Sequence, residues 1–246
     1  MKKGLFFESK MKQNIIGFIF ARKNSKRLPK KNILKLGRKL LIEHTIVASI
    51  KSNIFDKIIV SSDDEKIISL KKKYKDIFFD KRPKNLASDR AKNIDVLKYY
   101  LEKFDVINNF NFFSLMLPTC PFRSGDHLKK AYKIIKKSED INTILSVTKS
   151  TLPAQFSLIK KKKIVVPLLK NSPLLSNNTR SQNQAITFFP NGGFWICNSK
   201  KFMKTKNFYK GRIKIFEMNN FESVDIDTHF DYEFAKYLFK KNLKFS

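Results

Sequence analysis

Residues 15–32 read IIGFIFARKNSKRLPKKN, an apolar run that continues directly into a cationic segment. Because parallel strands of an α/β sheet are buried on both faces, the unbroken apolar run at 15–20 predicts such a strand. Open α/β sheets bind ligands outside the carboxyl ends of their strands. In the segment that follows, Arg and Lys supply charge for phosphate, and Asn and Ser supply hydrogen bonds. The stretch therefore predicts a site for a phosphate compound, the alternative being a solvated basic turn.

Strand and helix patterns alternate along the rest of the chain, which predicts an α/β fold with a mainly parallel sheet covered by helices. We expect an N-terminal tail at residues 1–13 and a single domain over residues 14–246. From about 150 to 190 the periodicity loosens, and this insertion is expected to form a small β-arm. Predicted strands lie at 15–20, 57–61, 77–79, 112–117, 143–148, 193–197 and 213–216, and predicted helices at about 40–52, 65–73, 94–104, 128–135 and 230–238.

Composition narrows the function classes. The net charge is +30, from 51 Lys and Arg against 21 Asp and Glu, and the lysines are spread along the whole chain. This spread favours a general compositional bias over a dedicated nucleic-acid surface. The chain has 7 glycines and contains neither G-x-x-x-x-G-K-[ST] nor G-x-G-x-x-G, so the common Gly-rich phosphate loops are excluded.

Cysteine spacing and hydropathy favour the cytoplasm. Cys120 and Cys197 lie far apart and form no C-x-x-C motif, as expected in a reducing compartment. The chain contains no apolar run near the ~20 residues of a membrane span. Residues 1–13 are charged and lack the apolar core of a signal peptide.

Asp225-Ile226-Asp227 is the second informative group. In extended backbone, residues i and i+2 point the same way, so both carboxylates face one side while Ile226 packs on the other. Like charges so close repel unless a cation lies between them. Mg²⁺ commonly uses one or two carboxylates together with phosphate oxygens. The pair therefore indicates a magnesium site, the alternative being a solvated pair at the start of the last helix.

The remaining polar residues are less specific. Arg82 lies in a loop and either contacts substrate or fixes that loop by a salt bridge, and Arg180 lies in the polar insertion. The histidines, His44, His127 and His229, show no metal-ligand spacing. The two cysteines are expected to be small buried residues, not nucleophiles.

The motifs together resemble the cytidylyltransferases that activate nonulosonic (sialic-type) acids, the CMP-N-acetylneuraminate synthetase family. The opening motif A-R-x-x-S-K-x-[LI]-P-x-K-N stands at 21–32, and the second strand with its turn stands at 55–63. Residues 117–123 (LPTCPFR) are similar to Q-P-T-S-P-L-R, and residues 223–228 (SVDIDT) to S-I-D-I-D-T. Two further motifs lie at 82–89 (RPKNLASD) and 190–193 (PNGG), so six occur in the family's order.

The resemblance implies a doubly wound α/β nucleotidyltransferase fold, CTP as substrate, Mg²⁺, and a homodimer in which the insertion helps to build the neighbouring subunit's site. It implies attack of the sugar's anomeric hydroxyl on the α-phosphorus of CTP, with release of pyrophosphate, in the biosynthesis of surface glycans. Carried over by position, the nucleotide residues would be Arg22, Ser25, Lys31, Asn32, Arg82 and Asn93. Arg180 would meet the sugar's carboxylate, and Asp225 and Asp227 would hold the metal.

Three positions depart from the family pattern. Leu117 replaces a Gln that contacts the sugar, Phe189 replaces an Arg before Pro-Asn-Gly, and Asn93 stands where a small hydroxyl residue is usual. The first two lie on the sugar side, so the sequence leaves the identity of the nonulosonic acid open. It also leaves open the general base, for which Asp227 is a candidate. A Kdo-type cytidylyltransferase and a non-catalytic basic nucleic-acid-binding protein are the alternatives.

Overall fold

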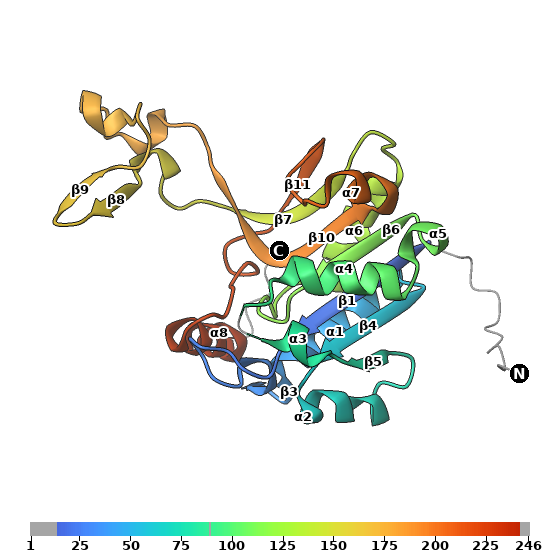
Figure 1. The fold of residues 1–246 in the computed structure, drawn as a ribbon. Helices are drawn as coiled ribbons and strands as arrows, with labels where there is room; N and C mark the ends of the chain where they lie inside the picture. Colours follow the sequence, from blue (N-terminus) through green and yellow to red (C-terminus); the bar gives the residue numbers. More distant parts are fainter. Residues whose placement is uncertain (1–13, 89, 242–246) are drawn as a thin grey trace, which may run out of the picture.

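The computed structural model describes residues 14–88 and 90–241, and a seven-stranded sheet with helices on both faces forms its centre (Figure 1). The sheet order is β11-β7-β10-β6-β1-β4-β5, and all neighbouring strands are parallel except that β10 runs antiparallel to β6 and β7. This confirms the predicted doubly wound, mainly parallel α/β fold. The expected tail at 1–13 lies outside the described residues. The strands are β1 (Ile15–Ala21), β4 (Lys57–Ser62), β5 (Phe78–Lys81), β6 (Phe112–Met116), β7 (Thr143–Lys149), β10 (Phe188–Asn198) and β11 (Ile213–Glu217).

Helices cover both faces of this sheet. The α-helices are α1 (Leu41–Ser52), α2 (Glu65–Ile68), α3 (Lys84–Ala87), α4 (Asn93–Lys103), α5 (Val106–Asn109), α6 (Gly125–Lys136), α7 (Ser199–Thr205) and α8 (His229–Lys241). Short 3-10 helices are η1 (Lys31–Ile33), η2 (Ser69–Lys72), η3 (Ala154–Phe156), η4 (Pro173–Ser176) and η5 (Ser181–Asn183). None of the α-helices in the described part of the chain is long and apolar enough to cross a membrane.

Strand β1 is apolar throughout because each of its faces packs into a different core. Ile15 and Ile19 belong to the core that α1 and α6 complete, whereas Ile16 and Phe18 belong to the core that α4 and α7 complete. All seven residues of β1 are buried. The strand that precedes the cationic segment is thus fixed on both sides, which holds the start of that segment in place.

Three parallel strands end at the same edge of the sheet. The register pairs Ala21 of β1 with Ser62 of β4, and Ile19 of β1 with Met116 of β6. The chain therefore leaves all three strands side by side, at Arg22, Asp63 and Leu117. This edge is where an open α/β sheet places its ligands.

Helix α8 brings the segment before it to this edge. It packs against a hairpin formed by β2 (Lys35–Leu36) and β3 (Lys39–Leu40), where Tyr232 donates a hydrogen bond to the Lys35 carbonyl at 2.6 Å. Gly37 in the hairpin turn has φ of 61°, and a Cβ there would overlap the ring of Phe239. Glycine at this position therefore permits close packing of α8.

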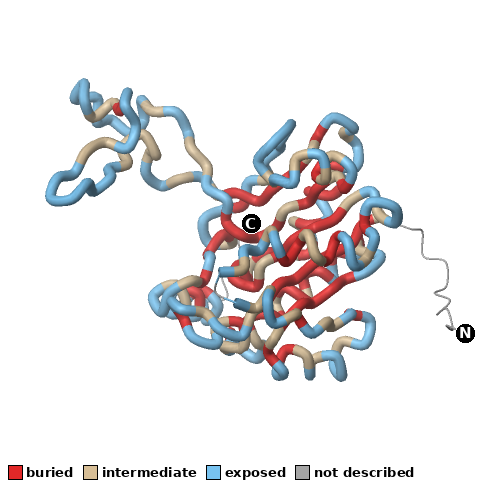
Figure 2. The backbone as a smooth tube through the Cα atoms, in the orientation of Figure 1, coloured by how far each residue is buried: buried red, intermediate tan, exposed pale blue. Residues whose placement is uncertain are grey.

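Residues 150–187 form an arm that projects from the end of β7 and returns into β10 (Figure 1). Its hairpin consists of β8 (Leu158–Lys161) and β9 (Ile164–Pro167), which pair antiparallel around a turn in the four-lysine run. Most of the arm is exposed and the rest is half-buried, apart from Ser172, the one buried residue in 150–187 (Figure 2). The arm confirms the expectation of a β insertion.

Two predicted elements differ from those observed by more than three residues at one end. The helix predicted at 65–73 is α-helical only in α2 and continues as the 3-10 helix η2. The strand predicted at 193–197 begins earlier, at Phe188, because β10 pairs with β7 on both sides of a bulge between Pro190 and Trp195. The Pro and Gly residues near the bulge indicate a turn when they are considered without the structure. The sequence therefore did not predict that the strand extends through them.

Candidate active site

A cavity of about 480 Å³ opens at the carboxyl edge of β1, β4 and β6. Its walls come from four parts of the chain that lie far apart in sequence: the end of β1 with the segment after it, the segment from the end of β5 to the start of α4, the loop after β6, and the segment before α8. The lining residues are Phe20, Arg22, Ser25, Lys26, Arg27, Lys31, Asn32, Arg82, Asn93, Leu117, Pro118, Thr119, Asp225 and Asp227. Every predicted site residue except Arg180 is among them.

The cationic segment is held in shape by two interactions of its backbone. The buried side chain of Asn32 donates from Nδ2 to the Arg22 carbonyl at 2.9 Å, which closes the segment on itself. The Lys23 amide donates to Oδ1 of Asp63 at 2.7 Å, which fastens the segment to the end of β4. Arg22 and Ser25 lie between these anchors and face the cavity. The cationic segment therefore forms one wall of the cavity and is not a solvated surface turn.

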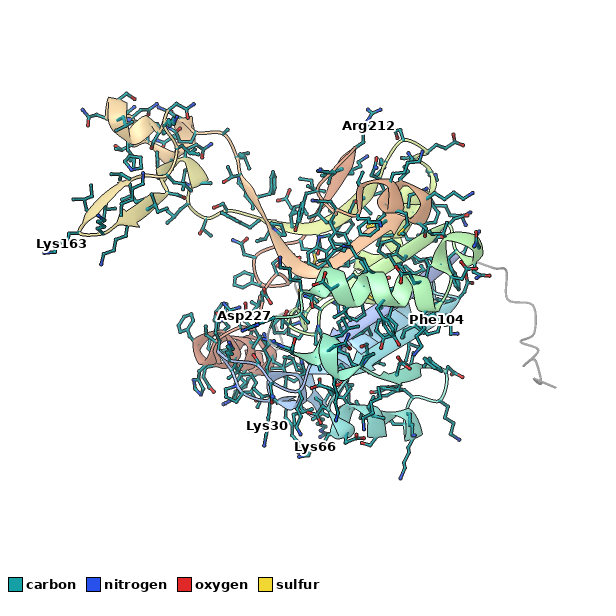
Figure 3. All side chains as sticks on the ribbon, in the orientation of Figure 1. Lys30, Lys66, Phe104, Lys163, Arg212 and Asp227 are labelled. Atoms are coloured by element: carbon teal, nitrogen blue, oxygen red, sulfur yellow. The ribbon has the colours of Figure 1, made fainter. Side chains whose placement is uncertain are left out.

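Asp227 meets two cations of this segment. Nζ of Lys31 donates to Oδ1 at 2.6 Å, and Nη2 of Arg27 donates to Oδ2 at 2.5 Å. The side chain of Lys31 is 11% exposed and that of Asp227 is 29% exposed, so this ion pair lies partly out of water. Figure 3 shows Asp227 between α8 and the sheet. The cationic segment and Asp227 are thus in direct contact.

Asp225, two residues before Asp227, also lines the cavity. The intervening Ile226 is fully buried and its amide donates to the Thr119 carbonyl at 2.8 Å, so the expected alternation of carboxylate, apolar residue and carboxylate is confirmed. Burial raises the pKa of Asp225, and repulsion from Asp227 acts in the same direction, while a hydrogen bond from Thr119 and the charge of Lys31 oppose them. A desolvated carboxylate beside a second one favours a cation.

The two carboxylates fit a hard divalent cation of the magnesium type. They are oxygen donors on one side of an extended segment, and both line the cavity. In the part of the chain that the structure describes, no cluster of three or more His, Cys, Asp or Glu side chains could enclose a metal. The donor set therefore suits an ion that completes its coordination with water and phosphate oxygens.

The opposite end of the cavity is built around Arg82. This buried guanidinium donates from Nε to Ser61 Oγ at 3.0 Å and from Nη2 to the Ser61 carbonyl at 3.1 Å, and it lies 5.5 Å from the ring centre of Phe20. Burial lowers the pKa of Arg82. Ser61 thus fixes the group, in place of the salt bridge considered from the sequence. Asn93, the first residue of α4, completes this end.

Arg123 fastens the loop after β6 to the bulge in β10. This fully buried side chain donates from Nη1 to the Gly193 carbonyl at 2.6 Å and to the Leu117 carbonyl at 3.2 Å. Next to the bulge, Gly192 has φ of 72°, and a Cβ there would lie 3.7 Å from Oδ2 of Asp225. The clamp therefore holds the loop after β6 against the part of β10 that passes beside Asp225.

Arg180 is not brought to the cavity within one chain. It lies exposed at the start of η5 on the arm, and the arm projects away from the sheet (Figure 1). Its predicted role stays a prediction.

Sequence reasoning missed several lining residues, above all Arg27, Lys26 and Thr119. The signal was present, because all three lie inside the motifs at 21–32 and 117–123. Sequence alone could not show which side chains of these motifs face inward.

The cysteines and histidines take no part in the cavity. Cys120 and Cys197 are buried, and burial raises the pKa of each thiol to about 12, so neither is a ready nucleophile. His127 lies at the start of α6, where its Nε2 is 3.4 Å from Oε1 of Glu222. These observations confirm the prediction that the cysteines are small buried residues and not nucleophiles.

The comparisons with known proteins agree with this geometry. The family model described as Cytidylyltransferase matches residues 16–245. Over 229 residues the chain is 33% identical to the N-acylneuraminate cytidylyltransferase of Escherichia coli O18:K1:H7, covering 92% of this chain and 52% of that relative. It thus spans about half the length of that relative and of the similar protein from Streptococcus agalactiae serotype III, of which it covers 51%.

Two shorter relatives are matched almost end to end. The chain is 31% identical to the CMP-N,N'-diacetyllegionaminic acid synthase of Legionella pneumophila, covering 93% of this chain and 97% of that one. It is 30% identical to the pseudaminic acid cytidylyltransferase of Campylobacter jejuni serotype O:2, covering 90% and 94%.

A solved CMP:2-keto-3-deoxy-manno-octonic acid synthetase shares the fold, with a TM-score of 0.66, 14% identity, and coverage of 93% of this chain and 99% of that one. The sequence matches confirm the resemblance that the six motifs indicated: the chain belongs to the cytidylyltransferase family.

Proposed function

We propose that this protein transfers CMP from CTP to the anomeric hydroxyl of a nonulosonic acid and releases pyrophosphate. One observation carries the proposal: the cationic segment and the two aspartates line the same cavity. They meet where Nζ of Lys31 donates to Oδ1 of Asp227 at 2.6 Å. A nucleoside triphosphate needs both, since its phosphates require cations and a divalent ion requires carboxylates. The names of the relatives supply the nucleotide and the sugar class.

The nucleotide is proposed to lie along the cavity from Arg82 to Lys31. Arg82 and Asn93 would contact the cytidine part at one end, with the ring of Phe20 beside the guanidinium. Arg22, Ser25, Lys31 and Asn32 would take the triphosphate at the other. Arg22 and Lys31 would balance the charge that grows on the leaving pyrophosphate.

Asp225 and Asp227 are the residues that would hold Mg²⁺. When bound, the ion would supply a Lewis acid for the α-phosphate and lower the pKa of the attacking hydroxyl. The protein's own part is positional, because in phosphoryl transfer most of the catalysis comes from orientation and charge. Thr119 fixes the Asp225 carboxylate, and Ile226 anchors the segment between the two aspartates.

The arm is proposed to complete the site of a second copy in a homodimer. It exposes many large apolar side chains, which a chain in isolation leaves in water: Leu152, Leu158, Ile159, Ile164, Val165, Leu168, Leu169, Leu175 and Ile186. An exposed apolar patch of this kind favours a protein interface. Residues 150–187 carry Lys and Arg but no Asp or Glu, so an arm reaching a partner's cavity would bring only positive charge. Arg180 would then pair with the sugar's carboxylate.

The cellular setting follows from the same chemistry. CTP as substrate and two unpaired cysteines favour the cytoplasm. The product would be a CMP-activated acidic sugar, a donor for building surface glycans.

The direct test is pyrophosphate release from CTP and Mg²⁺ with a panel of nonulosonic acids. We expect turnover with CTP and at least one nine-carbon acid, no turnover when ATP replaces CTP, and strongly reduced turnover when Asn replaces Asp225. Turnover with Kdo alone would assign the protein to the eight-carbon branch. No turnover with any acid, together with steeply salt-dependent binding to random DNA, would instead support a nucleic-acid-binding protein.

A further inference from the structure

Arg27 occupies a position that the proposed reaction does not yet explain. Its Nη2 donates to Oδ2 of Asp227 at 2.5 Å, while Nζ of Lys31 donates to Oδ1 of the same carboxylate at 2.6 Å. Both oxygens of Asp227 therefore accept hydrogen bonds from cations. Both ion pairs join the cationic segment to the aspartate segment.

A divalent ion at Asp227 needs the same oxygens that the two cations use. An ion coordinated by either oxygen would lie within a few ångströms of a guanidinium or an ammonium group. Charges of like sign at that separation repel strongly, and more so in a partly desolvated cavity than in water. In the observed geometry, therefore, the cations and the metal exclude one another at Asp227.

Arg27 and Lys31 differ in how readily each can break its ion pair with Asp227. Arg27 has a side chain that is 68% exposed, so its ion pair competes with water and contributes little stability. Lys31 is 11% exposed and is the first residue of η1, which fixes its backbone. The easily displaced partner of Asp227 is Arg27.

A triphosphate offers Arg27 another partner. The side chain of Arg27 lines the same cavity as Arg22 and Lys26 in the proposed phosphate region. A guanidinium binds phosphate oxygens at least as well as a carboxylate, often through two parallel hydrogen bonds. Moving from Asp227 to a bound triphosphate would satisfy Arg27 and free one oxygen of the aspartate.

We propose that Arg27 competes with the divalent ion for Asp227 and is drawn off by the phosphates of the nucleotide, so that metal and nucleotide bind in a coupled manner. The inference rests on the proposed function of the cavity. Arg27 thereby has two opposite effects: it weakens metal binding when no nucleotide is bound, and it strengthens binding of the triphosphate. Release of pyrophosphate would return Arg27 to Asp227 and favour release of the metal.

The test measures metal binding without nucleotide and nucleotide binding without metal, both in the full chain. Free Mn²⁺ is followed by electron paramagnetic resonance as the protein is titrated without nucleotide, and CTP binding is measured by equilibrium dialysis in EDTA. Arg27→Gln removes the charge while keeping a polar side chain of similar reach. We expect it to tighten Mn²⁺ binding by about fivefold, the size expected for an exposed ion pair, and to weaken CTP binding.

Lys30→Gln is the matched control. It removes one positive charge from the same segment, but Lys30 does not line the cavity, and Figure 3 shows it well away from Asp227. This variant is expected to change both affinities by less than about twofold, because surface charges act weakly at a distance in salt. Asp227→Asn should abolish the gain that Arg27→Gln produces, since the contested oxygens are then altered.

Three results would overturn the inference: equal Mn²⁺ affinity for Arg27→Gln and Lys30→Gln, tighter Mn²⁺ binding that survives Asp227→Asn, or no Mn²⁺ binding by any variant. The assay for pyrophosphate release is separate and decides the proposed function by itself. Turnover by the wild-type protein without the Arg27 effect removes the inference alone. The Arg27 effect without turnover removes the proposed reaction and leaves the competition intact.

Discussion

Strand β1 and the β8–β9 hairpin are both rich in apolar residues, yet their surroundings are opposite. All seven residues of β1 are buried between two helical layers. Every residue of β8 and half of β9 is exposed, including Leu158 and Ile164. Strand β1 thus buries its apolar residues within one chain, whereas the hairpin of the arm does not. We call the described chain outside residues 150–187 the body. Under the proposed function, this difference predicts that one chain supplies the nucleotide end of the site and that the sugar end needs the arm of a second copy.

The largest expected effect tests the body. Asp225→Asn keeps the size of the side chain but removes the negative charge that faces the cavity. We expect kcat to fall by about 10²–10³-fold, the cost of losing one preorganised electrostatic group at a reacting centre. Steady-state pyrophosphate release measures this, with Asp126→Asn on the exposed side of α6 as the control. If the two variants were equally active, the aspartate segment would have no part in turnover.

The next effect separates body from arm. Lys31→Ala is expected to lower kcat by roughly 10²-fold because it removes a cation beside the phosphates. Arg180→Ala is expected to raise the KM for the sugar by about tenfold, the order of one charged hydrogen bond, and to leave the KM for CTP unchanged. Lys163→Ala, at the hairpin turn, serves as the arm control (Figure 3). A change in the KM for CTP in Arg180→Ala would contradict the division of labour.

Stability should follow the same division. Ile19 is fully buried in β1, whereas Ile164 in β9 is 63% exposed. Ile19→Ala is expected to lower the free energy of unfolding by about 2–5 kcal/mol, and Ile164→Ala to change that of the dissociated chain by less than about 0.5 kcal/mol. Denaturant unfolding at several protein concentrations measures both. An Ile164 effect that grows with concentration would support an arm buried by a second copy, while a large effect at the lowest concentration would contradict the comparison.

The smallest expected effect concerns pH. Glu43 in α1 is buried, which by itself raises its pKa, but hydrogen bonds from Lys73, the Leu40 amide and Tyr74 outweigh burial and lower the pKa of Glu43 below its usual value. A lowered pKa in the folded state contributes stability above the unfolded pKa of about 4.3, and this is lost as pH falls through the folded value.

We therefore expect Glu43→Gln to cost about 1–3 kcal/mol at pH 7 and less in strong acid. Unfolding measured from pH 7 down to acid checks this. A cost that stayed constant with pH would show that the charge of Glu43 is not responsible. The arm at 150–187 contains no carboxylate side chain, so acid sensitivity of this kind belongs to the body alone.

The sequence predicted much of the body because its signals are local. The cationic segment at 21–32 and the pair of Asp225 and Asp227 were predicted from residue type and spacing. Side chains of both groups line the cavity. The contact between Arg27 and Asp227 could not be predicted from the sequence, since it joins residues 200 positions apart through the packing of α8 on the β2–β3 hairpin. The role of Arg180 stays a prediction, because the arm does not bring this side chain to the cavity of its own chain.

The most direct measurement of the central claim is a crystal structure with a non-reactive CTP analogue. The account predicts the triphosphate against Arg22 and Lys31, the cytidine part near Arg82, and the phosphates opposite Asp225 and Asp227. A nucleotide bound elsewhere, or one that leaves either the cationic segment or the aspartates untouched, would contradict it.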